Sequence, residues 1–364
     1  MTQPKVTVWL STYNQEPYVA QALDSILMQK TSFPFEVVAA DDCSTDGTQR
    51  VILEYQARFP DRIVTYFTNP NVGGCRKLCD CIDKGLFRGD YLAYLEGDDY
   101  WLGEDRLQTL VDFLEAHPEY SRVSHQRKVI DEEDRDKGFD TAESVLNRPF
   151  YIENLLRGEL YSDFGSVFRN YYREAGNRYH PLLLASRNVC DFQDMFITQD
   201  FGPVYVLDRA FSVYRSRSVA GATNYNSTVS QAGRCRENIR LARAVEEFYN
   251  GKYDLSPMIL HNQKRLLSEA VEARSPELLE AARKDVPSET VREIAPELLY
   301  LARRGKRTEE IRFLKEQLLP EEWRGLTAAA AGYAVKRVWW KLRNRKPNEK
   351  LRGYVRETIE GASP

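Results

Sequence analysis

The chain has 364 residues, of which 42% are hydrophobic and 29% are charged, a composition typical of a soluble globular protein with room for one large domain and a smaller one. The formal net charge of −3 argues against nucleic acid as the main partner. We expect a cytoplasmic protein, because no signal peptide opens the chain and no run of roughly 18 apolar residues is present to span a bilayer. Six cysteines fit a reducing compartment, and the spacing of Cys75, Cys79 and Cys81 matches no usual zinc pattern.

Strands and helices alternate through the first hundred residues. The apolar periodicity predicts strands over residues 6–10, 35–40, 63–67 and 91–95, and helices over residues 18–28, 48–58 and 74–84. Strand, helix and strand at this spacing give right-handed crossovers and a parallel sheet. Loops 11–17, 41–47 and 96–100 are therefore expected to meet at one edge of an α/β fold, where open sheets bind their ligands.

The fourth predicted strand ends on three acids around one glycine, Glu96-Gly97-Asp98-Asp99. Carboxylates this close repel one another unless a cation or a proton relieves the repulsion. Oxygen ligands suit Mg²⁺ or Mn²⁺, which take one or two carboxylates and complete their shell with phosphate oxygens and water. We interpret this segment as a metal clamp for a diphosphate. The alternative is a solvated acidic turn before the helix that begins near Asp105.

Two other loops offer groups that suit a nucleotide. Asp41 and Asp42 follow the second strand and supply acceptors for a uracil imide or for ribose hydroxyls, although Asp42 would also serve as a helix cap. The turn at 69–74 leads to a helix N-terminus with Arg76 and Lys77, which suits an anionic diphosphate. No Gly-x-Gly-x-x-Gly follows the first strand and no P-loop pattern occurs, which argues against NAD-type and P-loop sites.

Three segments in this order resemble glycosyltransferase family 2, inverting enzymes of the GT-A fold. They are Val6 to Glu16 (VTVWLSTYNQE), Val37 to Thr48 (VVAADDCSTDGT) and Leu95 to Trp101 (LEGDDYW), within a resemblance that covers roughly residues 5–220. The resemblance implies a Rossmann-like, mostly parallel sheet, a nucleoside-diphosphate-sugar donor with a UDP-sugar favoured, and Mn²⁺ or Mg²⁺ held by Asp98 and Asp99. The donor-binding positions that it implies are Thr12, Tyr13, Asn14, Glu16, Asp41, Asp42, Gly73, Arg76, Lys77, Glu96, Asp98, Arg215 and Arg217.

The second half of such a domain binds the acceptor and supplies the base. The segment 190–197 resembles the family's aspartate followed by an apolar helix, which implies Asp191 as the base, with Asp194 one turn further on as the alternative. Either acid could instead be only a charge at a helix N-terminus. His125, at the end of a predicted strand over 120–125, and Trp101 are candidate acceptor-side residues.

This sequence departs from the family pattern at two places. Arg217 stands where many relatives carry a histidine, so the implied diphosphate clamp is cationic, and the asparagine common after the Gly73 turn is missing. We also expect a mobile acceptor-side loop over residues 131–148, where the sequence is charged and aperiodic.

Beyond residue 226 the sequence changes to amphipathic helices. We divide the chain into a GT-A domain over residues 1–225, with a nucleotide-sugar half at 1–126 and an acceptor half at 127–225, followed by a helical domain at 226–322 and a basic amphipathic tail at 323–364. A basic helix with tryptophans, such as this tail carries, suits either an anionic membrane surface or packing on the helical domain.

The sequence therefore predicts a metal-dependent inverting glycosyltransferase of the hexosyltransferase type. It would move one sugar to a hydroxyl of a glycan, lipid-linked or protein acceptor in glycan or glycoconjugate assembly, with an aspartate as general base. A nucleotidyltransferase of similar architecture is one alternative, although loop 11–17 lacks the Gly-rich basic character that it needs. A non-catalytic nucleotide-sugar-binding or scaffold protein at the membrane is the other.

Overall fold

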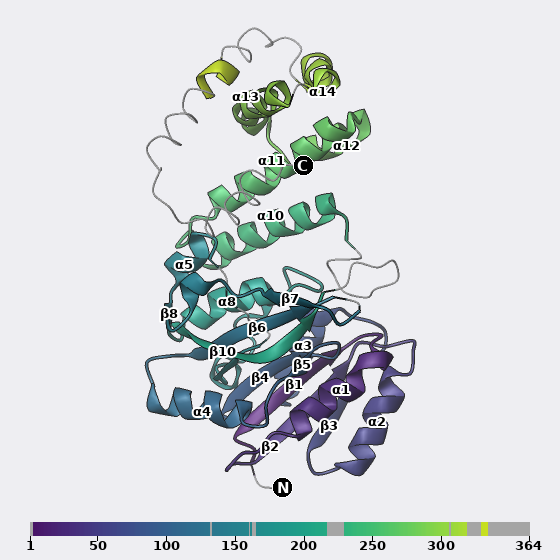
Figure 1. Ribbon diagram of the computed structural model, residues 1–364, viewed down its shortest axis with the longest axis vertical. Helices are drawn as coiled ribbons and strands as arrows, with labels where there is room; N and C mark the ends of the chain where they lie inside the picture. The colour runs from purple at the N-terminus through teal and green to yellow at the C-terminus, as the bar shows by residue number, and fades with distance from the viewer. Residues whose placement is uncertain are drawn as a thin grey trace. The chain divides into compact units, whose positions relative to one another are not determined.

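The computed structural model describes residues 3–131, 133–159, 161, 165–216, 229–305, 307–318 and 329–333. The chain divides into two compact units, the first formed by Met1–Val229 with Glu247–Gly251 and the second by Ser230–Glu246 with Lys252–Pro364. The first unit contains the α/β sheet and the second is helical (Figure 1).

The N-terminal half of the sheet is parallel. Its strands lie in the order β3 (Ile63–Phe67), β2 (Phe35–Asp41), β1 (Val6–Thr12) and β4 (Tyr91–Glu96). The register pairs Thr12 with Asp41 and Ser11 with Glu96, so these strands end at the same edge. Helices α1 (Glu16–Leu27), α2 (Thr48–Arg58) and α3 (Gly74–Asp83) make the crossovers.

Side chains alternate between the two faces of β1 because a strand has a period of two residues. Val6, Val8 and Leu10 are fully buried in the hydrophobic cluster that also contains the apolar sides of α1, α2 and α4 (Arg106–Ala116). Trp9 points to the other face, where its ring lies 5.1 Å from that of Tyr94. Both faces of this strand are therefore covered, which holds its C-terminal loop in place.

The second half of the sheet is mixed. Strand β9 (Val167–Arg169) pairs antiparallel with β4 and with β6 (Arg122–Ile130), and β6 pairs parallel with β10 (Val204–Arg215). The strand β5 (Tyr100–Trp101) closes the order against β10. Shorter elements complete this half: β7 (Asp136–Phe139), a 3₁₀ turn (Glu143–Val145), β8 (Arg148–Phe150), α5 (Ile152–Leu156), α6 (Tyr172–Ala175), α7 (His180–Leu183) and α8 (Asp191–Gln199).

The α/β fold expected from the sequence is confirmed, but two boundaries were wrong. The strand expected to end at residue 125 continues to Ile130, and the expected loop 131–148 contains β7, which pairs with β6. All four residues of β7 are exposed, so the strand carries no apolar alternation that a sequence pattern could reveal.

The second unit is built from helices around its own core, which confirms the expected change of character. The helices are α10 (Gln231–Phe248, shared with the first unit at its end), α11 (Ser256–Ala273), α12 (Pro276–Arg283), α13 (Ser288–Arg304) and α14 (Thr308–Phe313), which leads into a π-helical turn (Leu314–Leu318). Leu267, Ile294 and Leu299 are fully buried in this core.

Most of the predicted basic tail lies outside the described residues, which include only 329–333 of it. Of the helices in the described part of the chain, none combines the length and the apolar character needed to cross a membrane.

Candidate functional site

The three loops expected to meet at the C-terminal edge of the parallel strands are neighbours. Asn14, whose φ is +50°, donates its backbone N–H to Ser44 Oγ and accepts from the N–H of Thr45, both at 2.8 Å. Gln15 Nε2 donates to Asp98 Oδ1 at 2.9 Å. These bonds join the loop after β1 to those after β2 and β4, as the parallel topology requires.

Asp41 and Asp42 are both buried and have different partners. Asp41 accepts from Thr12 Oγ1 at 2.9 Å, from the N–H of Ser44 at 2.8 Å and from Gln49 Nε2 at 2.6 Å. Asp42 does not cap α2, since its carboxylate accepts from the backbone N–H groups of Val72 and Gly73, both at 2.8 Å. Asp42 therefore fixes the loop 69–74 against the end of β2.

The two cations expected at the diphosphate have different surroundings, one buried and one exposed. Lys77 is 2% exposed, and its Nζ donates to the carbonyls of Thr12 and Ala40 at 3.0 Å each, which ties the ends of β1 and β2 together. Burial lowers the pKa of this lysine. Arg76 is exposed and pairs with Asp80 along the same helix at 2.9 Å.

Glu16 also has a local role in the structure. Its Oε2 accepts from the backbone N–H of Gly47 at 2.9 Å, and its Oε1 pairs with Arg50 at 2.9 Å. Tyr13, by contrast, is 37% exposed at the tip of the same loop, so its ring is accessible to a ligand.

The acids after β4 form an excess of negative charge. Burial, then the charges of Asp98 and Asp191, raises the pKa of Glu96 to about 7. Burial and the charges of Asp98 and Glu96 raise the pKa of Asp99 well above its usual range. Asp99 Oδ1 also accepts from the backbone N–H of Arg215 at 2.9 Å, which fixes its orientation. Such a cluster gains from a bound cation or from protons.

No group of three or more His, Cys, Asp or Glu side chains within the described ranges is arranged to hold a metal ion by itself. Mg²⁺ in particular is commonly bound through one or two carboxylates plus substrate phosphates. Asp98 and Asp99 fit that mode, because they supply carboxylates but leave part of a coordination shell to other ligands.

The two candidate bases lie in different surroundings. Asp191 is the first residue of α8 and is partly exposed, and burial raises its pKa. Asp194 is 1% exposed, pairs with the fully buried Arg122, and accepts from the hydroxyls of Tyr171 at 2.7 Å and Tyr172 at 2.6 Å. The structure therefore gives Asp194 a place in a buried polar network and leaves Asp191 as the acid beside Glu96.

The structure argues against both expected acceptor-side residues. His125 is fully buried, its Nδ1 lies 2.7 Å from the carbonyl of Gln126, and burial lowers its pKa to about 3. Trp101 is 1% exposed and lies under the guanidinium of Arg106 at 3.9 Å. Neither side chain is presented to an acceptor, because each belongs to the packing between the sheet and α4.

Arg215 is held by protein partners. Its guanidinium lies 5.1 Å from the ring centre of Tyr18 and 5.3 Å from that of Tyr100, donates to Gln21 Oε1 at 2.5 Å and pairs with Asp134. Its expected companion Arg217 lies outside the described residues.

Arg127 on β6 acts electrostatically on the acid cluster, and sequence reasoning missed it. Its Nε donates to Asp140 Oδ2 at 2.8 Å and its guanidinium lies 4.4 Å from the ring centre of Tyr214. Its charge opposes the upward pKa shifts that burial causes in Glu96, Asp99 and Asp191. The sequence held no clear signal for it, because the strand was expected to end before residue 127.

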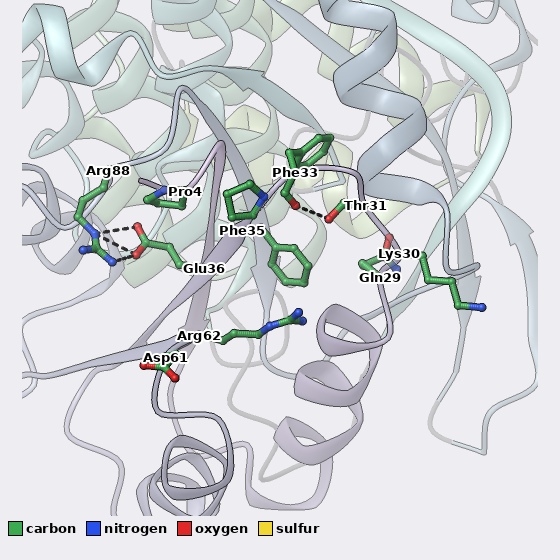
Figure 2. Close-up of a pocket in the computed structure, with 11 residues that line it drawn as sticks. Pro4, Gln29, Lys30, Thr31, Phe33, Phe35, Glu36, Asp61, Arg62 and Arg88 are labelled. Atoms are coloured by element: carbon green, nitrogen blue, oxygen red, sulfur yellow. Dashed lines mark hydrogen bonds and ion pairs between the residues drawn. The ribbon is translucent and has the colours of Figure 1, made fainter. Parts of the chain in front are cut away.

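A separate cavity of about 710 Å³ lies at the opposite edge of the sheet, near the start of β2. Figure 2 shows its lining, in which Arg88 pairs with Glu36 and Arg62 lies over Phe35 at 5.1 Å. Because Arg88 and Glu36 neutralise one another, nothing here matches the acid cluster at the C-terminal edge.

Comparison with known proteins adds the family context. Residues 7–179 match the family described as Glycosyl transferase family 2. An uncharacterized protein of Mycobacterium tuberculosis (strain ATCC 25618 / H37Rv) is 43% identical over 122 residues, 34% of this chain and 35% of that relative. An uncharacterized glycosyltransferase of Nostoc sp. (strain PCC 7120) is 28% identical over 242 residues, 63% of this chain and 72% of the relative.

A solved structure supports the fold. Residues 1–349 of Staphylococcus aureus TarS in complex with UDP-GlcNAc match with a TM-score of 0.53 at 17% identity, covering 88% of this chain and 92% of the other. In sequence, TarS, a poly(ribitol-phosphate) beta-N-acetylglucosaminyltransferase, is 32% identical over 116 residues, 31% of this chain and 19% of TarS. The chain thus spans about a third of the length of the Mycobacterium relative and less of TarS.

Proposed function

We propose that this chain, whose residues 7–179 match the family described as Glycosyl transferase family 2, is an inverting, metal-dependent enzyme. It would transfer one sugar from a nucleoside-diphosphate sugar to an acceptor hydroxyl. The observation that carries this proposal is the cluster of Glu96, Asp98 and Asp99 at the C-terminal edge of the sheet, with Asp191 as its electrostatic neighbour. The acceptor would be a glycan, a lipid-linked group or a protein in glycan or glycoconjugate assembly.

Asp98 and Asp99 would hold Mg²⁺ or Mn²⁺. The bound cation would neutralise the charge that develops on the leaving diphosphate. Gln15 and the backbone N–H of Arg215 orient these two carboxylates at 2.9 Å each. Carboxylates fixed in this way need little reorganisation when the charge develops, which favours the transition state.

Asp191 would act as the general base. Its carboxylate takes the proton of the acceptor hydroxyl as that oxygen attacks the anomeric carbon from the face opposite the leaving diphosphate. Burial raises the pKa of Asp191 and so makes it a stronger base than an exposed aspartate. No covalent enzyme intermediate is needed in this scheme.

We favour a UDP-sugar as the donor. TarS, with which this chain shares its fold, is described in complex with UDP-GlcNAc. The exposed ring of Tyr13 offers a stacking surface for a base at the tip of the loop after β1. The fixed loops of Asp41 and Asp42 would then shape the pocket through backbone groups, because both carboxylates already have protein partners.

Calorimetric titration with UDP, GDP, CDP and dTDP, each with and without Mn²⁺, tests the proposal. We expect one nucleotide to bind only with Mn²⁺, and we expect Asp99→Ala to lose that binding. Asp61→Ala is the matched control, because Asp61 is exposed and lies near the opposite edge of the sheet. Failure of every nucleotide to bind under both conditions would overturn the transferase reading and favour a scaffold role.

A further inference from the structure

Two segments that are far apart in the sequence meet beside the proposed base. The donor-side loop, residues 69–74, leads into α3, and the base-side turn, residues 186–190, leads into α8. The backbone N–H of Cys75 donates to the carbonyl of Arg187 at 3.1 Å. The Cys75 thiol contacts the Cys190 thiol, and this contact together with burial raises the pKa of Cys190 well above its usual range.

Arg187 provides the side-chain part of this junction. Its Nη2 donates to the backbone carbonyl of Asn71 at 3.0 Å and to Asn71 Oδ1 at 2.6 Å. Its stem packs on Gly73, where an added Cβ would lie 2.4 Å from Arg187 Cγ and 2.5 Å from the Arg187 carbonyl oxygen. The glycine at position 73, with φ +91°, is what allows this close approach.

The donor-side loop is also held without Arg187. The carboxylate of Asp42 accepts from the N–H groups of Val72 and Gly73, and the Asp42 carbonyl accepts from Asn71 Nδ2 at 2.7 Å. Loss of the Arg187 guanidinium should therefore leave this loop in place.

The base-side turn depends more on the junction. Ser186 Oγ accepts from the N–H groups of Asn188 at 3.3 Å and Val189 at 3.0 Å, but these bonds lie within the turn. In the described part of the chain, residues 187–189 hydrogen-bond to other segments only through Arg187. The Arg187 guanidinium and its backbone carbonyl thus tie residues 187–189 to the donor-side loop and to the start of α3. The body of α8 is held separately, by the buried Asp194 network, so the Arg187 guanidinium bears on the turn just before Asp191.

We propose that Arg187 is a positioning residue that fixes Asp191 relative to the bound donor. The inference rests on the proposed function, in which Asp191, four residues further along, is the base. Arg187 itself is exposed and acts by fastening the base-side turn to a loop that Asp42 already holds. Geometry of this kind matters because small misplacements of a reacting group reduce turnover strongly.

Arg187→Met is the informative variant, since it keeps an unbranched stem over Gly73 and removes the guanidinium. With a donor that the wild type turns over, we expect kcat to fall about tenfold, or ~1.4 kcal/mol in activation free energy. The Kd of the nucleotide should stay within about twofold, because Asp42 still holds the donor-side loop. Arg173→Met is the matched control, since Arg173 is an exposed arginine paired with Asp90 at 2.8 Å, next to the start of β4.

A double-mutant cycle with Asn71→Ala separates the proposed tether from two independent effects. Asn71→Ala has an effect of its own, because it also removes the Asn71 Nδ2 bond to the Asp42 carbonyl. If Arg187 acts through Asn71, Arg187→Met should lower kcat less in the Asn71→Ala background than in wild type, since the bond to Asn71 Oδ1 is already lost there. Additive losses in the double variant, or a kcat of Arg187→Met within twofold of wild type, would overturn the proposal.

Hydrogen exchange read by mass spectrometry tests the tether without any activity. Arg187→Met should speed amide exchange over residues 187–192 and leave the amides of Val72 and Gly73, which bond to Asp42, unchanged. Unchanged exchange over residues 187–192 would refute the tether. If wild type turns over no donor while the exchange result holds, the proposed function fails and the tether stands. If wild type is active and the exchange is unchanged, the tether alone fails.

Discussion

Asp191 and Asp194 lie three residues apart on α8, yet their surroundings predict opposite consequences of the same substitution. Asp191→Asn removes the proposed proton acceptor, so we expect turnover to fall by about 10² to 10⁴-fold while nucleotide affinity is unchanged. Asp194→Asn instead leaves Arg122, which is fully buried, without its charged partner. Removing one member of such a pair costs about 3 to 5 kcal/mol of unfolding free energy.

Denaturant unfolding and steady-state kinetics on both variants separate these two effects. A stable Asp194→Asn protein with wild-type folding but lost turnover would move the role of base to Asp194. Wild-type turnover in Asp191→Asn would exclude Asp191 as the base. Wild-type turnover in both variants would exclude both acids.

The pKa of Glu96 predicts how metal binding depends on pH. Because burial and neighbouring acids raise this pKa to about 7, Glu96 is protonated below pH 7, and its charge is available to the cluster only after that proton is lost. Burial raises the pKa of Asp99 as well, so the two acids add to the same pH dependence. Mn²⁺ affinity measured in the presence of nucleotide should therefore weaken as pH falls from 8 to 6, by up to about tenfold per unit below pH 7. Glu96→Gln should flatten this dependence, and an equal slope in the variant would assign the proton to another group.

For individual residues, the sequence could predict which acids lie in which loops, but not which side chains they contact. Asp98, Asp99 and Asp191 could be proposed because strand ends and helix starts are local features. The burial of Lys77 and Trp101 could not be predicted, because it depends on which segment covers each side chain in three dimensions. Arg127 was missed for the same reason, since its role follows from the register of β6 against β10.

The turn before α3 shows what one element demands of one residue. Gly73 has φ +91° and its Cβ position is occupied by Arg187, whereas Gly85, just after the same helix, has φ +62° and nothing within 4 Å of its Cβ position. Gly73→Ala should therefore cost more unfolding free energy than Gly85→Ala, which carries only the backbone strain of about 1 kcal/mol. Thermal unfolding of the two variants measures this difference.

Gly73→Ala should also reduce nucleotide binding, because the donor-side loop must move to admit the methyl group. Equal stability of the two alanine variants would show that the base-side turn yields without cost, and it would weaken the case for a rigid junction at Arg187.

Element boundaries were predictable where the apolar pattern is strong. Strand β3 and helix α2 have the bounds that the apolar pattern predicted, and α2 buries Ile52 and Tyr55 along one side. The β6–β7 hairpin was not predictable, because β7 is exposed throughout and is fixed by pairing with β6, not by burial.

Among the described residues, one hydrophobic core of the first unit and one of the second share no residue. One core lies between the sheet and helices α1, α2 and α4, and the other is formed by helices of the second unit. Chains with separate cores often do not unfold in one two-state step. The change from alternating strands and helices to helices alone was visible in the sequence, because beyond residue 226 the apolar residues recur only at the three- and four-residue spacing of helices.

Leu23 in the first core and Leu299 in the second give a matched pair of substitutions, since both are fully buried. Each change to alanine should cost about 2 to 5 kcal/mol of the free energy of unfolding of its own unit. A nucleotide bound at the C-terminal edge stabilises only the unit that binds it. Nucleotide with Mn²⁺ should therefore raise the midpoint temperature of the transition that Leu23→Ala lowers. It should leave unchanged the midpoint temperature of the transition that Leu299→Ala lowers. Calorimetric unfolding with and without ligand measures both midpoint temperatures. A single transition lowered equally by the two variants would show that the cores unfold together. In that case the helical unit would contribute stability to the site itself.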